Sequence, residues 1–343
     1  MSLNTAPARP AAPVPFYETG KRTRDLAHEL GCSEAEILDR HAGPEVVRLR
    51  CEPADLVESL ADLRQIMALT RNEAAVHEIV GTFANVSISG PMGLVLAPPL
   101  DLRLFLRFWV HAYAVEIPDG GNAPRRSLQI FDGAGEAVIK IHLRPVSDIA
   151  AFEALRDRFA DKDPAPRIFT PHPPADGPSA TVDAAAFRRD VAGMDDIHEF
   201  VPLLRKHGVD RRQSLDLMGA PDVRRLGAGA ATAILTRAAD DQVPIMCFVG
   251  NRGCIQIFTG HVATVKAMGP WINVLDQGFN LHLREDLVAE AFVVRKPTRE
   301  GALTSVELYG ADRALIAQFF GERERGRPER RAWQSLVEAL PHV

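Results

Sequence analysis

Cysteine is scarce in this chain of 343 residues, and the few that occur signal no cross-link. Cys32, Cys51, Cys247 and Cys254 form no C-x-x-C pair, so neither a disulfide scaffold nor a structural zinc site is indicated. No apolar run approaches the ~18 residues that a membrane-spanning helix needs. Residues 1–15 lack the basic and apolar regions of a signal peptide, and we expect this Ala- and Pro-rich lead to be disordered. These absences favour a cytoplasmic protein without membrane insertion.

Aromatic residues are few, and the chain has no excess of positive charge. Aromatic side chains make up 6% of the chain, and the formal net charge is −5. Nucleic-acid-binding domains usually carry a basic excess and often stack bases on aromatic rings, so nucleic acid is not an expected partner. The apolar and charged fractions, 46% and 25%, are those of a globular protein with a buried core. The length predicts about two domains.

The common catalytic motifs are also absent. The chain has no P-loop and no G-x-S-x-G elbow. His77 and His198 are each followed by Glu, as at the start of H-E-x-x-H, but the second His is missing. The stretch GAGAAT at 227–232 lacks the third glycine of a dinucleotide fingerprint and does not follow an expected strand. A hydrolase or an NAD-dependent oxidoreductase is therefore disfavoured, and isolated histidines and basic residues remain.

An internal duplication is the clearest organisational signal. Four segments of the first half recur in the second half in the same order and at nearly one offset, which makes a tandem duplication the best interpretation. A repeat of this length is far too long for a solenoid, so we expect two similar lobes. The matched segments are 26–38 with 203–215, 80–90 with 249–260, 100–115 with 279–294, and 127–141 with 305–319.

A proline-rich segment separates the halves. Residues 163–183 contain repeated prolines, which fix φ and remove backbone N–H donors, so an extended linker is expected. We therefore place the first repeat at 16–162 and the second at 184–340.

Each half changes its apolar periodicity midway. Residues 17–40 and 54–67 have helical spacing, with a capping box at Ser33 and Glu36, whereas the later segments alternate with period two. The DGAG stretch at 132–135 is a hairpin signal. Helices followed by a meander of strands predict an α+β fold with N-terminal helices and a large antiparallel sheet in each half.

Two side chains stand out within this pattern. His198 follows two acids at the expected start of the first helix after the linker, where it would either face a cleft between the lobes or cap the helix at the surface. Arg103 shares a strand face with Phe105, because Leu102 and Leu104 point to the other face. It is either a surface side chain lying along apolar atoms or a cation aimed into a pocket. His111 and His282 are as readily explained as structural residues.

A resemblance emerges from a series of short motifs that run in order through most of the chain. Together they resemble the haemin-degrading factors, the HemS-type haem-utilisation proteins of haem-importing bacteria. The motifs are AVHE (75–78), LDLRLFL (100–106), SLQIFD (127–132), MDDIHEF (194–200), FVGNRGCIQIFTG (248–260), WINV (271–274), FNLHL (279–283), RKPT (295–298) and GERERG (321–326).

The resemblance implies one haem b bound in a cleft between two similar halves. In this family the His of D-x-H-x-F is the proximal iron ligand, which is His198 here, and the Arg of D-L-R-L-F lies on the distal side, which makes Arg103 the candidate catalytic residue. His77 is implied as a secondary haem contact. The other implied haem-binding positions are Phe105 beside Arg103, Arg211 and Lys296 at the propionates, Met246 and Phe248 at the porphyrin wall, and Gln318 at the rim.

Three functions are implied as alternatives. The protein would be a carrier that receives imported haem for iron acquisition, or an oxygenase that opens the ring itself, and the same site would serve both. A haem importer or a downstream haem oxygenase is the implied partner, and an oligomer remains open. Nucleic-acid binding is the third alternative, which the net charge disfavours.

Overall fold

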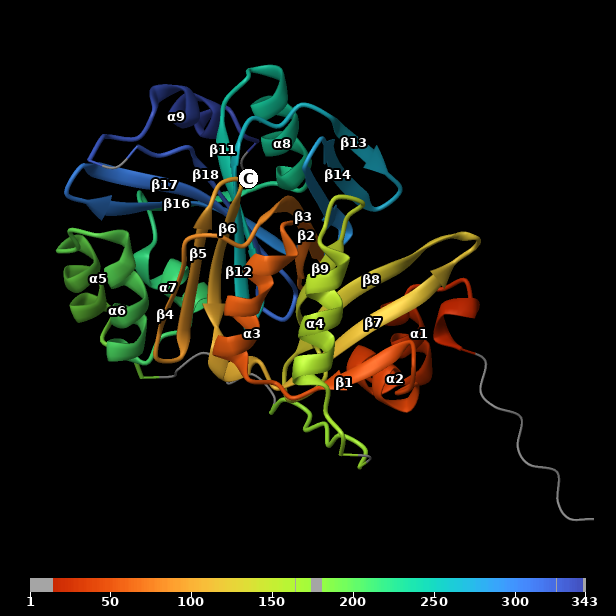
Figure 1. Ribbon diagram of the computed structural model, residues 1–343. Helices are drawn as coiled ribbons and strands as arrows, with labels where there is room; N and C mark the ends of the chain where they lie inside the picture. The colour runs from red at the N-terminus through yellow and green to blue at the C-terminus, as the bar shows by residue number, and fades with distance from the viewer. Residues whose placement is uncertain (1–14, 164, 174–180, 325, 342–343) are drawn as a thin grey trace, which may run out of the picture.

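Two large antiparallel sheets form the centre of the molecule (Figure 1). The computed structural model describes residues 15–163, 165–173, 181–324 and 326–341, so the N-terminal lead lies outside the described residues. The first sheet runs, edge to edge, β1 (Val46–Leu49), β7 (His111–Asp119), β8 (Asn122–Phe131), β9 (Ala137–Leu143), β2 (Gln65–Arg71), β3 (Ala75–Thr82), β15 (Phe279–Arg284), β14 (Trp271–Asp276) and β13 (Val265–Met268). The second runs β10 (Val223–Leu226), β16 (Glu290–Thr298), β17 (Gly301–Tyr309), β18 (Leu315–Gly321), β11 (Ile245–Gly250), β12 (Cys254–Gly260), β6 (Leu100–Phe105), β5 (Met92–Ala97) and β4 (Val86–Ser89).

The sheet order shows an exchange of strands between the halves. Each sheet takes six strands from its own half and three from the other. Strand β6 of the first half pairs with β12 of the second, and β15 pairs in the same way with β3. Figure 1 shows the orange strands β5 and β6 beside the teal strand β12. The prediction of an α+β duplicate with two large antiparallel sheets is confirmed, but neither sheet belongs wholly to one half.

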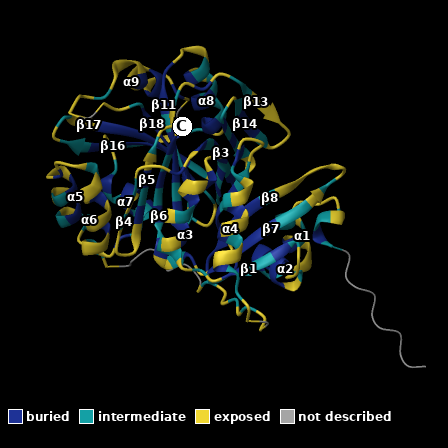
Figure 2. Cartoon of the chain, viewed as in Figure 1, coloured by how far each residue is buried: buried dark blue, intermediate teal, exposed yellow. Residues whose placement is uncertain are grey.

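A continuous apolar core lies between the sheets. On β6, Leu102 and Leu104 are fully buried while the residues between them are partly exposed, and Leu281 and Leu283 of β15 repeat this pattern. The expected period-two alternation is therefore confirmed for both matched strands. Figure 2 shows the strands largely buried and the exposed residues on the outer helices. Four helices pack into this same core, namely α3 (Pro53–Ser59), α4 (Ile149–Phe159), α8 (Ala230–Asp240) and α9 (Arg331–Glu338).

Helices also cover part of the outer face of each sheet. Helices α1 (Thr23–Leu30) and α2 (Glu34–Arg40) pack on the first sheet, through a cluster that includes Tyr113 and Phe131. Helices α5 (Ala184–Ala192), α6 (Phe200–His207) and α7 (Arg211–Met218) pack on the second sheet in the same manner. None of the described helices has both the length and the apolar character that crossing a lipid bilayer requires.

Local capping confirms the helical repeat. The side chain of Ser33 accepts the N–H of Glu36 at 3.2 Å, and the Glu36 carboxylate accepts the N–H of Ser33 at 2.8 Å, which is the expected capping box. Helices α1 and α6 both end at a glycine in the left-handed region, Gly31 with φ 63° and Gly208 with φ 62°. A side chain with a Cβ is strained in that region, so the same residue type ends both helices.

Two details of the sequence interpretation need correction. The match of 80–90 with 249–260 is wrong in register, because Val80 lies in β3 whereas Val249 lies in β11, which occupies the place of β2 in the repeat. The first helix after the proline-rich segment is α5, so His198 precedes the second one. Residues 184–192 thus form a separate helix that the sequence interpretation did not predict.

The described part of the proline-rich segment lies against the first half. Residues 165–173 form neither helix nor strand. The N–H of Arg167 donates to Asp39 at 3.1 Å, and the imidazole of His172 lies 2.7 Å from Asp132. Residues 164 and 174–180 of the expected linker lie outside the described residues, and the domain boundaries stay predictions.

His77 lies at the centre of the core rather than at its surface. It is fully buried on β3, and its ring contacts that of Phe279 edge to face at 5.1 Å between centroids. Burial lowers the pKa of His77 to about 3. Its place in the repeat is taken on β12 by Gln256, whose amide donates to the His77 carbonyl at 3.2 Å.

This burial predicts a histidine-dependent loss of stability in acid. Below the ordinary pKa of 6.5 the unfolded chain takes a proton at His77, while the folded chain does not do so until pH about 3. Stability is therefore lost as pH falls through this window, by roughly 1.4 kcal/mol per pH unit for one proton. H77Q, which copies Gln256, is expected to remove this part of the slope in urea unfolding between pH 6.5 and 4. The exposed control H261Q should retain it, and an unchanged slope in H77Q contradicts the assignment.

Candidate functional site

A single row of side chains crosses the outer face of the second sheet. Residues that lie directly opposite each other in antiparallel strands point to the same face of the sheet. The row therefore brings side chains of both halves onto one surface. In order across the strands it consists of Asp101, Ile257, Phe248, Gln318, Glu307 and Phe292.

A second row beside it completes the apolar part of this face. Met246 lies opposite Phe320, and the rings of Phe320 and Phe248 are in edge-to-face contact at 5.1 Å between centroids. Met246, Phe248 and Gln318 are each partly exposed. The expected wall residues therefore lie together, and Gln318 stands within the first row, between Phe248 and Glu307.

Helices α5–α7 cover one end of this face and leave the other end open. They bury Phe292, Val294 and Tyr309 of strands β16 and β17. The strands from β18 to β5 continue the face beyond the helices. The helix layer and the open sheet therefore meet along one line.

His198 lies at the start of the helix layer, in a short 3-10 turn, Ile197–Glu199, that leads into α6. Asp196 caps this turn by accepting the N–H of His198 at 2.8 Å, and Glu199 completes a capping box. The same Asp196 carboxylate lies 2.6 Å from Nδ1 of His198. Because the His198 side chain is 89% exposed, Nε2 remains accessible. A fixed imidazole with an accessible Nε2 is a suitable metal or haem-iron ligand.

Arg103 lies on the open part of the sheet and forms an ion pair with Asp101, two residues earlier on the same face. Burial raises the pKa of Asp101, and the Arg103 guanidinium partly offsets that rise. The Arg103 side chain retains 35% exposure, so a charged donor is presented at the surface. Phe105 follows on the same face. The expectation that Arg103 and Phe105 share one face of the strand is confirmed.

Arg211 and Lys296 meet beneath the helix layer, around the carboxylate of Glu307. The ammonium of Lys296 donates to Glu307 at 2.8 Å, and the Arg211 guanidinium lies 3.7 Å from the same oxygen. Burial alone would raise the pKa of Glu307, but the two cations and the Tyr309 hydroxyl bring it to about 2. Lys296 is only 2% exposed, so it is not a basic residue of a solvated loop.

His77 is not part of this group. It lies on β3 of the other sheet, buried between the layers. His282, which holds the place of Arg103 in the repeat, faces Asn273 at 2.7 Å between Nδ1 and the amide oxygen. His111 is also buried, against Phe169.

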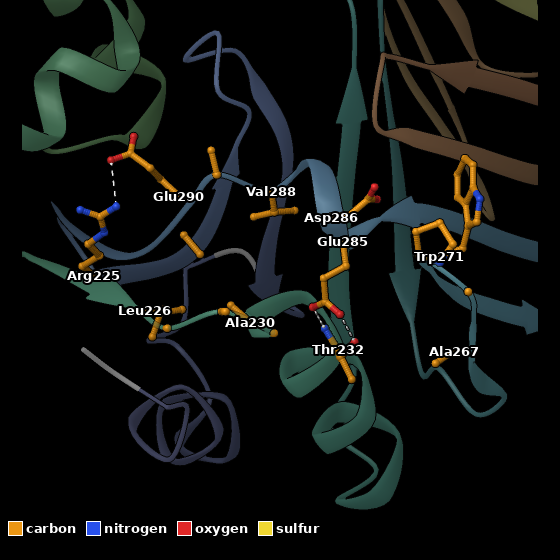
Figure 3. Close-up of a pocket in the computed structure, with 17 residues that line it drawn as sticks. Arg225, Leu226, Ala230, Thr232, Ala267, Trp271, Glu285, Asp286, Val288 and Glu290 are labelled. Atoms are coloured by element: carbon orange, nitrogen blue, oxygen red, sulfur yellow. Dashed lines mark hydrogen bonds and ion pairs between the residues drawn. The ribbon is translucent and has the colours of Figure 1, made fainter.

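A cavity of about 610 Å³ lies away from the expected residues, at the start of α8 (Figure 3). Here the GAGAAT stretch does follow a strand, β10, and opens a helix, contrary to the sequence interpretation. The Glu285 carboxylate nevertheless accepts the N–H of Thr232 at 2.9 Å and thereby holds the helix N-terminus. A phosphate would meet this negative charge, so the rejection of a dinucleotide site stands on electrostatic grounds.

Two charged residues of the candidate site were not predicted from the sequence. Asp101 and Glu307 both lie on the site face, the first paired with Arg103 and the second with Lys296. Period-two spacing could have placed Asp101 on the same strand face as Arg103, because it stands two residues before Arg103 in LDLR. For Glu307 the same spacing in SVELYG places it on one face with Ser305 and Tyr309, but its cationic partner comes from another strand.

Comparison with known proteins agrees with the duplicated fold. A family model described as the haemin-degrading HemS.ChuX domain matches residues 31–159 and again 208–340. The chain is 37% identical over 322 residues to the hemin transport protein HmuS of Yersinia pestis, which covers 94% of this chain and 93% of that protein.

Solved structures show the same architecture. Holo-PhuS, a heme-binding protein from Pseudomonas aeruginosa, matches with a TM-score of 0.90 and 41% identity over 95% of this chain and 96% of that one. ChuS, described as an E. coli heme oxygenase, matches with a TM-score of 0.86 and 35% identity over 95% and 98% of the two chains. With two copies of the family domain and relatives along nearly its whole length, the chain belongs to the HemS family of haemin-degrading-domain proteins.

Proposed function

We propose that this protein binds haem b on the outer face of the second sheet, at the edge of helices α5–α7, and serves bacterial haem uptake and iron acquisition in the cytoplasm. The observation that carries this proposal is His198, an exposed imidazole that is held at Nδ1 by Asp196 and lies at the margin of the helix layer. The relatives named as hemin transport and heme-binding proteins support the choice of ligand. The free cysteines agree with a reducing compartment.

The chemistry of this face fits haem. The ligand is a flat apolar ring with two carboxylates and an iron that takes an imidazole, and the face offers partners for each part. His198 Nε2 is the proposed iron ligand, and the contact of Asp196 with Nδ1 fixes the orientation of the imidazole. Arg211 and Lys296 are the proposed partners of the carboxylates. The ring would lie on Met246, Phe248, Phe105 and Gln318, with Arg103 on its distal side.

Arg103 connects binding to a second candidate activity. Haem supplies the redox chemistry of its iron when it is bound, and a cation on the distal side stabilises negative charge that develops there. Asp101 orients the Arg103 guanidinium through their ion pair. Because one solved relative is described as a heme oxygenase, degradation of haem is the alternative to carriage. Delivery to a downstream haem oxygenase, after receipt from an importer, is the carrier form of the proposal.

Haemin titration followed by absorbance tests the ligand assignment. We expect the wild type to give a 1:1 shift of the Soret band, and H198A to lose the shift or to bind at least about tenfold more weakly, because the iron loses its imidazole. The matched control is H28A, an exposed histidine of α1, which is the first-half counterpart of α6. A wild type that shows no shift contradicts the proposal, and H198A binding like H28A rejects the ligand.

The carrier and the oxygenase differ in the fate of the bound haem after reduction. With catalase present to remove free peroxide, we expect the haem of the loaded protein to survive addition of a reductant and to be lost only when a separate haem oxygenase is added. Iron release with a defined tetrapyrrole product in the absence of that enzyme would instead establish degradation by this chain. In that case R103M should lower the rate of haem degradation while leaving the affinity for haemin largely unchanged.

A further inference from the structure

Glu307 is a fully buried carboxylate with a complete set of partners. One oxygen accepts from the Lys296 ammonium at 2.8 Å and from the Ser305 hydroxyl at 3.1 Å, and the other accepts from the Tyr309 hydroxyl at 2.6 Å. The Arg211 guanidinium lies 3.7 Å from the first oxygen. Both hydroxyl donors are themselves buried, so the carboxylate is fixed in place.

The two cations around Glu307 share one aromatic ring. The ammonium of Lys296 lies 4.6 Å from the centre of the Phe200 ring, and the Arg211 guanidinium lies 5.6 Å from it. Burial lowers the pKa of Lys296, and the positive charge of Arg211 lowers it further. The Glu307 carboxylate offsets both effects, so the arrangement depends on it.

The repeat shows that the fold itself does not require an acid at this position. In the first half, β8 is the counterpart of β17, and Gln129 occupies the place of Glu307 with its amide donating to the Ser127 hydroxyl at 3.0 Å. The first half has Ile117 at the place of Lys296 and Glu34 at the place of Arg211. The carboxylate and its two cations therefore occur together, in one half only.

We propose that Glu307 is a positioning residue. It keeps Lys296 and Arg211 charged and adjacent, so that the two cations can bind the carboxylates of the ligand on this sheet. This inference rests on the proposed function for the identity of that ligand. The cluster holds two cations and one anion, and its net positive charge favours a carboxylate as the ligand.

The surroundings supply no other buried anion to Lys296 among the described residues. Of the remaining charged groups packed against this cluster, Arg212 is engaged by Glu290 at 2.6 Å. Arg188, Asp222 and Arg295 line a neighbouring cavity of about 490 Å³ with Lys296. Without Glu307, the buried ammonium would have cations, aromatic carbon and only the exposed carboxylate of Asp222 around it, and its neutral form would be favoured.

Binding of haemin and of haemin dimethyl ester to E307Q tests the proposal. In the wild type we expect haemin affinity to vary little from pH 6 to 9 relative to the ester. In E307Q, the neutral amine of Lys296 must take up a proton when a carboxylate binds, so haemin affinity should fall by at least about tenfold over this range. The ester has no free carboxylates and should show no such loss, which separates this effect from pH effects on iron ligation.

Controls keep the result specific. E290Q removes one negative charge from the Arg212 pair and should behave as the wild type, and K296M/E307Q should lose the pH dependence while binding haemin more weakly than the wild type. Tighter haemin binding by E307Q at all pH values would overturn the proposal, because Glu307 would then compete with the ligand. An equal loss for haemin and ester would also overturn it, by showing a purely structural role.

If E307Q does not fold, K296M/E307Q is used in its place, because this variant removes both buried charges together. A loss specific to haemin supports the proposal in that case, and a loss shared by the ester contradicts it. A wild type that binds neither compound would reject the proposed function, whereas a normal wild type with a normal E307Q would reject only the role of Glu307.

Discussion

The pairing of β6 with β12 is the constraint on which the site depends. It places Arg103 directly opposite Ile255 and so attaches a strand of the first half to the sheet of the second. The outer face of that sheet then carries Arg103 and Phe105 from one half together with Met246, Phe248 and Gln318 from the other. The reciprocal pairing of β15 with β3 closes the first sheet in the same way. Separation of the halves would expose two long strand edges and dismantle the row of side chains.

Duplication supplied two equivalent faces, and only one of them has the residues of the proposed site. At the start of the helix layer, the second half has His198 with its Asp196 partner. Where the second half has Arg211 beside Glu307, the first half has Glu34, whose carboxylate pairs with Lys140. The Glu34 carboxylate also lies 3.7 Å from the Arg71 guanidinium, so the first half holds a carboxylate of its helix layer between two cations, whereas in the second half the carboxylate lies on the sheet. The proposed ligand-binding role therefore falls to one half of the duplicated architecture.

The sequence supports prediction of the elements better than of their partners. Capping at Ser33, the alternation of β6 and β15, and the hairpin at 132–135 were all predictable, because they depend on residues close together in the chain. The exchange of strands between the two sheets was not predictable, because period-two alternation shows which face of a strand is buried but not which sheet the strand joins. The same limitation explains why an α+β duplication could be predicted, whereas sheets built from strands of both halves could not.

The site shows the same division between local and long-range information. Arg103 and Phe105 were placed on one face by spacing alone, and the structure confirms this. Of the positions implied by the family resemblance, those on strands other than β3 lie on this face, whereas His198 and Arg211 belong to the helix layer. The burial of His77 between the sheets could not be predicted from AVHE. Lys296 looks like a solvated basic residue in RKPT. Its burial beside Glu307 of the adjacent strand could not be predicted from that motif, because the ring that lies against its ammonium, Phe200, comes from α6.

A crystal structure of the wild type with haemin tests the central claim most directly, that both halves build one haem site on the second sheet. The account predicts iron bound to Nε2 of His198, with Arg103 on the opposite face of the porphyrin and its carboxylates toward Arg211 and Lys296. Haem bound on the first sheet, or with Arg103 remote from the iron, would contradict it.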